Sequence, residues 1–305
     1  MLGCGLDPIV KNKTESFNLK LALKMKIQVG PASQAKDSPF NKFLWFLTKI
    51  LLVPAERNSV GEYKFRILSW RYFFSWLVWS FLSSSATIFI FSAEIRNILT
   101  YLGSTQNFDQ TAGLLFYQTK HAFDIMILYA TPVCLGYLVN NYNIEKKCLI
   151  LPSRKIEILL YTISYFITGL LGTLETEDKT KVVTFIEFCI LIFTTVVTMI
   201  LYNTLVTNFV EYCKKIKELP FEAQGDAMKQ ILVEYARLKV GLGPTAMIWH
   251  IYIIVYLVAI SYSLAISPTL FMGIFLISFT IQIWNISACC QEAYYALQSA
   301  GQVLR

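Results

Sequence analysis

The sequence predicts an all-α fold: a polytopic membrane helix bundle of six transmembrane helices with cytoplasmic helical extensions. Composition is the first observation, because 55% of the 305 residues are hydrophobic, only 15% are charged and the mean hydropathy is +0.50. Soluble domains carry about 25% charged residues. The other two observations are that the apolar residues gather in long runs and that the basic residues gather between alternate runs. This pattern argues against a soluble enzyme and against a disordered chain.

Six apolar segments approach the roughly 20 residues that a helix needs to cross a bilayer. Each is rich in Ile, Leu, Phe and Val and is bounded by polar stretches. None alternates in polarity over about 10 residues, as a strand of a membrane β-barrel would. The spans are therefore expected at residues 74–93, 122–139, 158–174, 182–206, 246–266 and 269–290.

The segment before the first span contains no further crossing. The run Phe43–Val53 is short and carries Lys49, so we interpret it as an interfacial or buried helix. Residues 1–40 have scattered lysines and no apolar core of a signal peptide, and we expect them to form a flexible cytoplasmic N-terminus. Residues 41–305 are expected to form a single transmembrane domain.

The basic residues predict the orientation of the bundle. In this arrangement 23 of the 27 Lys and Arg residues fall on one side, in the segment before the first span, in alternate loops and in the tail. Since loops rich in Lys and Arg stay in the cytoplasm, both termini are predicted to be cytoplasmic. The expected location is the plasma membrane.

The connection between the fourth and fifth spans is predicted to be helical. Asn208–Leu219 and Asp226–Val240 have helical patterns, which we expect to be interrupted at Pro220 and Gly225. The stretch after Cys290 contains good helix formers and should continue the sixth span. Residues 207–245 and 291–305 are thus predicted to form one cytoplasmic helical module.

No enzyme motif is present. The chain has only two histidines, no phosphate-binding loop and no nucleophile elbow. No CxxC pair or paired-histidine motif predicts a metal site, and none of the seven cysteines falls in a predicted outer loop. We therefore expect no catalytic activity, no metal and no cofactor, and nothing predicts a nucleic-acid partner.

Four residues are candidates for contact with a small ligand. His121 and Asp124 are three residues apart at the outer end of the second span and share a helix face. They are either a ligand-contacting pair or an interfacial histidine beside a structural acid. Glu187 and Tyr165 fall in the outer parts of their spans, where tyrosines and phenylalanines could line an apolar pocket. The Glu187 carboxylate either contacts a ligand or ion or extends to the outer membrane interface.

Two further polar residues occur in the sixth span. Gln282 and Asn285 lie in its inner half. Polar side chains at such positions commonly join transmembrane helices through hydrogen bonds. We expect both residues to form interhelical polar contacts.

The order of these parts resembles the arthropod gustatory and odorant chemoreceptor superfamily. The segment YKFRILSWRYFFSWLVWS (Tyr63–Ser80) is similar to the basic and aromatic entry to that family's first span. ILVEYARLKVGLGPTAMIWHIYIIVYLV (Ile231–Val258) resembles the long helix that leads through a glycine turn into span five. WNISACCQEAYYALQSAGQVL (Trp284–Leu304) resembles the cytoplasmic extension of span six.

The resemblance implies a receptor that binds a small tastant or odorant in the outer half of the bundle. It also implies a subunit of a tetrameric ligand-gated cation channel, homo- or hetero-oligomeric, with subunit contacts in the inner module. The family's Thr-Tyr … Gln-Phe motif, in a seventh pore-lining span, has no counterpart before Arg305. We therefore expect either a longer chain or a member that does not conduct alone, and no pore residue is carried over.

The alternative is a small multi-pass transporter or a non-conducting accessory subunit. Transporters often contain internal repeats and helices broken by Gly or Pro near the midplane. Here Pro132 and Gly136 fall in the second span, and no repeat relates the two halves. The sequence thus favours the receptor over the transporter.

Overall fold

The computed structural model describes residues 39–58, 63–79, 81–82, 130–140, 154–175, 181–217, 221–266 and 270–302. These residues are mostly helical. Two short helices cover residues 70–79 and Ala130–Val139. The labelled elements are α3 (Pro39–Lys49), β1 (Ala55–Arg57), β2 (Tyr63–Phe65), α6 (Lys155–Glu175), α7 (Lys181–Lys217), α8 (Phe221–Ile266) and α9 (Leu270–Gln302).

Three of the described helices are long and apolar enough to cross a membrane. The apolar stretches are Lys155–Leu174, Phe185–Lys215 and Leu270–Gln302, and they overlap the predicted third, fourth and sixth spans. A shorter apolar stretch, Met247–Tyr262, lies within α8 at the predicted fifth span. Most of the predicted first span and residues 122–129 of the predicted second span lie outside the described residues.

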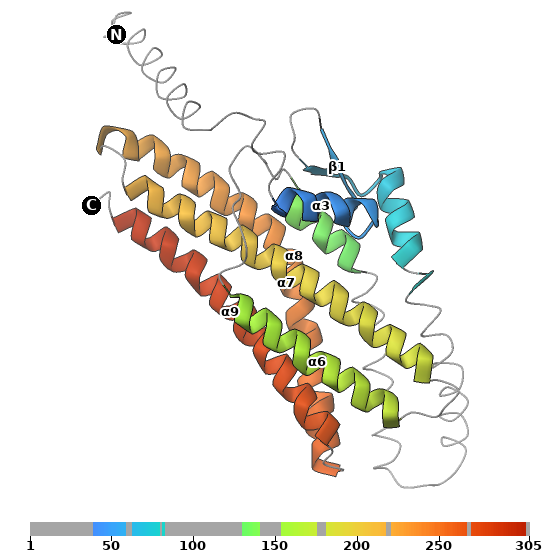
Figure 1. Cartoon of the computed structure of the whole chain (residues 1–305). Helices are drawn as coiled ribbons and strands as arrows, with labels where there is room; N and C mark the ends of the chain where they lie inside the picture. The colour runs from blue at the N-terminus through green and yellow to red at the C-terminus, as the bar shows by residue number, and fades with distance from the viewer. Residues whose placement is uncertain are drawn as a thin grey trace, which may run out of the picture.

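The long helices form one bundle. α9 packs against α6, α7 and α8, and α7 also packs against α6 and α8 (Figure 1). The inward face of α6 is buried while its outward face is apolar and exposed, which is the arrangement expected of a helix in lipid. The exposed apolar residues of α6 are Ile156, Leu159, Leu160, Ile163, Phe166, Ile167, Leu170 and Leu174.

Three helices extend well beyond the bilayer-sized part of the bundle. Figure 1 shows α7, α8 and α9 continuing past the level at which α6 begins, toward the end where the C-terminus lies. At 1.5 Å per residue, the 46 residues of α8 measure about 69 Å along the helix axis. We call residues 208–217, 221–242 and 291–302 the helical extensions. The extensions of α7 and α8 contact each other, since the Phe209 and Tyr235 rings lie 5.7 Å apart and the Tyr212 hydroxyl donates to Gln230 Oε1 at 3.1 Å.

The predicted helix break at Gly225 is wrong. α8 begins at Phe221, directly after Pro220, and continues without interruption through Gly225 and Pro244. A glycine costs a helix only about 1 kcal/mol relative to alanine, which packing against α7 and α9 can outweigh. Pro244 cannot supply a backbone N–H to the helix, and such prolines bend helices. Figure 1 shows α8 changing direction near its middle, and the helix continues past Pro244 to Ile266.

A small β-hairpin departs from the predicted all-α class. β1 and β2 are antiparallel, with Ala55 opposite Phe65 and Arg57 opposite Tyr63. Ala55, Tyr63 and Phe65 are buried, so one face of the hairpin packs against the protein. Three-residue strands give too short an alternation to stand out in sequence. Leu51, with φ of 60°, lies in the turn between α3 and β1.

We call α3, the hairpin and the helix at 70–79 the N-terminal unit. Arg71 donates to the Thr48 carbonyl at 3.0 Å, and the Ser75 hydroxyl donates to the Leu51 carbonyl, so the two helices are joined. The interfacial or buried helix predicted at residues 43–53 thus overlaps α3 and the turn after it.

The N-terminal unit attaches to the bundle through the helix Ala130–Val139. The Phe65 N–H donates to Asn140 Oδ1 at 3.0 Å, and the Phe65 ring lies against Tyr137 and Gly136. On the other side of the same helix segment, the Cys134 carbonyl accepts a hydrogen bond from the Thr245 hydroxyl of α8 at 3.5 Å. This short helix therefore lies between the hairpin and α8.

Candidate functional site

A buried amide pair joins α7 to α9. Asn203 Nδ2 donates to Asn285 Oδ1 at 2.8 Å, and both side chains are fully buried. Asn203 Nδ2 also donates to the Met199 carbonyl of its own helix at 2.8 Å. Two amides in an apolar bundle satisfy each other because an unpaired amide there is costly.

An ionic group joins this amide pair to α6 at the start of that helix. Asn285 Nδ2 donates to Glu157 Oε2 at 2.9 Å, and the other oxygen of Glu157 accepts from Arg154 at 2.7 Å. The second terminal nitrogen of Arg154 reaches Glu292 of α9 at 2.5 Å. The guanidinium therefore bridges carboxylates on two helices. We call these five residues, Arg154, Glu157, Asn203, Asn285 and Glu292, the junction network.

Solvent exposure increases across the junction network, from its buried amides to its partly exposed charged groups. The side chains of Arg154, Glu157 and Glu292 are 16%, 24% and 40% exposed, whereas Asn203 and Asn285 are 0% exposed. Partial burial lowers the Arg154 pKa, but the hydrogen bond and charge of Glu292 and the charge of Glu157 outweigh it, so the pKa of Arg154 is raised. The guanidinium thus stays charged. The network has the form expected where a helix bundle leaves the apolar layer for water.

Two cysteines of α9 lie beside the junction network. The Cys289 thiol donates to Asn203 Oδ1 at 2.9 Å, and the hydroxyl of Tyr202 lies 2.9 Å from Cys290 Sγ. Each bond joins α7 to α9. These cysteines therefore add to the polar contacts between the two helices.

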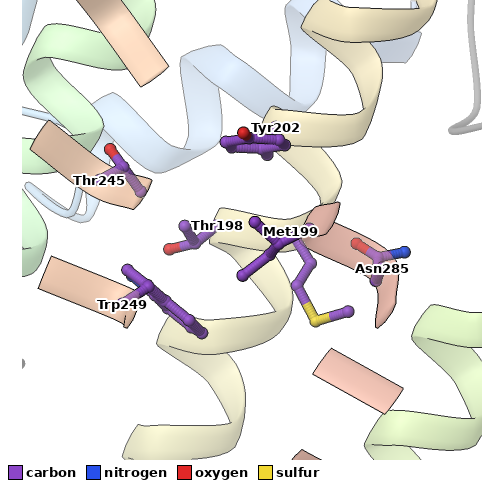
Figure 2. A pocket seen from close by; sticks show the side chains of 7 residues that line it. Thr198, Met199, Tyr202, Thr245, Trp249 and Asn285 are labelled. Atoms are coloured by element: carbon purple, nitrogen blue, oxygen red, sulfur yellow. The ribbon is translucent and has the colours of Figure 1, made fainter. Parts of the chain in front are cut away.

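A small cavity adjoins Asn285 on the side facing α8. Its volume is about 10 Å³, which is near the minimum for a single water molecule. Figure 2 shows Thr198 and Met199 of α7 between Trp249 of α8 and Asn285. It is too small for an organic ligand. The remaining wall residues are Tyr202, Thr245 and Ile286.

The residues proposed from sequence for ligand contact do not gather around this cavity. Tyr165 is buried and its ring is surrounded by aromatic rings at centroid distances of 5.4 to 6.4 Å. Glu187 is buried in α7, with 5% exposure. His121 and Asp124 lie outside the described residues. The rings around Tyr165 are Tyr161, Phe188, Phe275 and Phe279.

The two polar residues of the predicted sixth span have different surroundings. Asn285 is hydrogen-bonded to both α6 and α7. Gln282 is fully buried, but neither atom of its amide group has a hydrogen-bond partner in the part of the chain that the structure describes. Among the described residues, Gln282 therefore does not form the interhelical hydrogen bond that was expected of it.

Sequence reasoning missed Arg154, Glu157, Asn203 and Glu292. Glu157 precedes the predicted third span by one residue and Asn203 lies three residues from the end of the fourth. Asn285 lies five residues from the end of the sixth, so all three have a similar depth in the bundle. Comparing the depth of polar residues between spans could therefore have found Glu157 and Asn203.

No known relative adds to this description. Comparisons of the chain with protein-family models, with curated proteins and with solved structures gave no match. Within the described ranges, no group of three or more His, Cys, Asp or Glu side chains could hold a metal ion.

Proposed function

We propose that the chain is a chemosensory receptor of the gustatory type, a subunit of a ligand-gated cation channel that binds a small organic molecule. The observation that supports the proposal is the continuity of the long helices. α7, α8 and α9 run unbroken from the apolar bundle into the extensions, and the junction network crosslinks α6, α7 and α9 where the extensions begin.

This arrangement suits a protein that passes a signal along helices. A rigid helix carries a displacement at one end to the other, and a group of interhelical hydrogen bonds can exchange between discrete arrangements. A ligand shifts such an equilibrium only by binding one arrangement more tightly than the other. The junction network, in which one guanidinium serves two carboxylates, is our candidate for the element that differs between the two states.

The ligand is proposed to bind in the predicted outer half, near Tyr165 and Glu187, with His121 and Asp124 as further candidates. Tyr165 and Glu187 occupy adjacent helices, α6 and α7, which pack against each other. Because rings fill the space around Tyr165, binding would have to displace at least one of them. Aromatic walls with a few polar groups are typical of pockets for organic molecules.

Recording from oocytes tests the proposal. The full chain, alone and with candidate partner subunits, should give cation currents evoked by a panel of sugars, alkaloids and amino acids. Glu187→Gln and Tyr165→Phe should shift the concentration for half-maximal current without changing surface expression. Thr280→Ala is the matched control, because Thr280 is exposed on α9 and its hydroxyl donates to the Leu276 carbonyl of the same helix at 2.9 Å.

The same cells distinguish the alternative. Saturable uptake of a panel compound, with no evoked current in any subunit combination, would overturn the receptor proposal in favour of a transporter. An accessory subunit would give a different result. Currents would appear only with a second subunit, the chain would increase them, and Glu187→Gln would have no effect on them.

A further inference from the structure

We propose that the N-terminal unit rests on the bilayer surface and binds the headgroups of anionic phospholipids through exposed aromatic and basic side chains. This inference does not depend on the receptor function. It requires only that the bundle is embedded in lipid. The unit would then hold its end of the bundle at a fixed depth in the leaflet.

The outward face of α3 has the composition of a membrane interface. Lys42, Trp45, Phe46 and Lys49 are all exposed and have the i, i+3, i+4, i+7 spacing of a single helical face. The Trp45 side chain is 53% exposed, and Lys49 Nζ lies 5.3 Å from the centre of its ring. An aromatic pair flanked by lysines suits the layer between lipid tails and headgroups. The opposite face of α3 already packs inward, since Phe40, Leu44 and Leu47 are buried.

The segment after β2 presents a second apolar surface. Leu68 is 100% exposed and Trp70 is 78% exposed. The Trp70 ring lies 6.1 Å from Phe73 and 6.4 Å from Phe74, which are also exposed, so the aromatic side chains form a cluster. An exposed apolar patch of this kind at the start of a helix is a contact site for a membrane or a protein rather than a surface for water.

The positive charge of the N-terminal unit favours membranes that contain anionic lipids. In the described residues 39–58, 63–79 and 81–82, the acidic residue is Glu56, against six basic residues. Anionic lipids attract such segments with about 1 kcal/mol for each Lys or Arg near the surface. The basic residues are Lys42, Lys49, Arg57, Lys64, Arg66 and Arg71.

Contacts with the bundle fix the position of the N-terminal unit along the length of the bundle. The hairpin packs on the helix Ala130–Val139, whose Cys134 carbonyl accepts from Thr245. Thr245 lines the same cavity as Asn285, a member of the junction network. The unit is therefore attached near the level of Asn285, whose amide donates to the Glu157 carboxylate of the network. Figure 1 likewise shows α3 beside the bundle near the level at which α6 begins.

Photo-crosslinking identifies the occupant of the apolar surface. The full-length protein, with p-benzoylphenylalanine replacing Leu68 or Phe46, is placed in nanodiscs of phosphatidylcholine and phosphatidylserine and illuminated. Mass spectrometry should find phospholipid adducts at both positions. The control position is Leu232, which is 51% exposed on an α8 extension and should give no lipid adduct. Adducts to a second copy of the chain or to another protein, or no lipid adduct at position 68, would overturn the proposal.

A second experiment tests the headgroup preference. Electron spin resonance of spin-labelled lipids compares the affinity of the protein for phosphatidylserine and phosphatidylcholine. The double substitution Lys42→Gln/Lys49→Gln should lower the preference for phosphatidylserine by up to about fivefold for each charge removed. The preference should also vanish in 1 M salt, where screening acts within about 3 Å.

A matched double variant controls for net charge. Lys229→Gln/Lys239→Gln removes the same charge from exposed positions on the α8 extension and should leave the preference unchanged. An equal loss in both double variants would mean that only the total charge matters. That result, or no loss in either, would overturn the specific role of the N-terminal unit.

Discussion

At the scale of single residues, Asn285 is the member of the junction network whose amide forms hydrogen bonds with two other helices, α6 and α7. Its amide donates to Glu157 of α6 and accepts from Asn203 of α7. An amide is suited to this position because it carries both donors and an acceptor without a charge. Removing it would leave a buried amide and a partly buried carboxylate each short of a partner.

Asn285→Leu should therefore destabilise the bundle by about 1–3 kcal/mol, the cost of leaving buried polar groups unpaired. Unfolding of the purified protein in mixed micelles by added denaturing detergent measures the change. Thr280→Leu, on the exposed face of the same helix, should have little effect. Equal stability of the Asn285→Leu protein and wild type would show that the network adds nothing to stability.

Tyr63 gives a prediction that depends on pH. Its side chain is buried, its hydroxyl has no hydrogen-bond partner in the described residues, and burial raises the pKa of the phenol despite opposing effects of Arg57 and Arg71. Because the unfolded chain loses this proton first, near pH 10, the stabilising effect of the neutral phenol is complete below that pH and is lost as pH rises above it.

Tyr63→Phe should remove this alkaline loss. Thermal unfolding in detergent should show wild type losing more stability than the variant between about pH 9 and pH 11. At neutral pH the variant should be at least as stable as wild type, because a buried hydroxyl without a partner is removed. Parallel pH profiles for the two proteins would contradict the buried position of Tyr63.

At the scale of elements, close packing attaches the hairpin to the helix Ala130–Val139. A methyl group added at Gly136 would lie 2.5 Å from Cδ2 of Phe65. The Phe65 ring also contacts Tyr72 and Tyr137, at centroid distances of 5.8 and 5.2 Å, and has little room to move. The absence of a side chain at Gly136 therefore permits the contact.

Gly136→Ala should destabilise the attachment by about 1–3 kcal/mol, the usual cost of overpacking. Thermal unfolding in detergent measures it, and Phe65→Leu in the same chain should recover part of the loss. Gly273→Ala is the control, since no neighbouring side chain of the described residues lies within 4 Å of the added methyl and alanine favours the helix. A loss as large at Gly273 as at Gly136 would contradict the packing explanation.

At the scale of the whole molecule, the described helices form an apolar bundle with extensions on one side. The distribution of basic residues predicts that this side is cytoplasmic. The proposed lipid contact of the N-terminal unit depends on the same membrane boundary, so orientation matters to each functional inference.

Epitope tags at the two termini should be reached by antibody only after the cells are permeabilised. The physical reason is the excess of Lys and Arg in the segments predicted to be inside, 23 against four. Immunofluorescence before and after permeabilisation measures antibody access to the tags. The control is a tag inserted in the predicted outer loop between the first two spans, which antibody should reach on intact cells. Staining of either terminus on intact cells would overturn the predicted orientation.

The sequence alone determined that this is a helical protein suited to a membrane, because apolar runs of bilayer length have few other stable arrangements. It could also indicate Asn285, since a polar side chain inside a span needs a partner. It did not indicate that Glu157 and Asn203 are the partners, because they come from helices distant in the chain. It missed the hairpin and the continuity of α8, where packing outweighs weak local preferences. Only the tertiary structure decided which polar groups meet, because the relative rotation and depth of packed helices are not encoded in the pattern of any one of them.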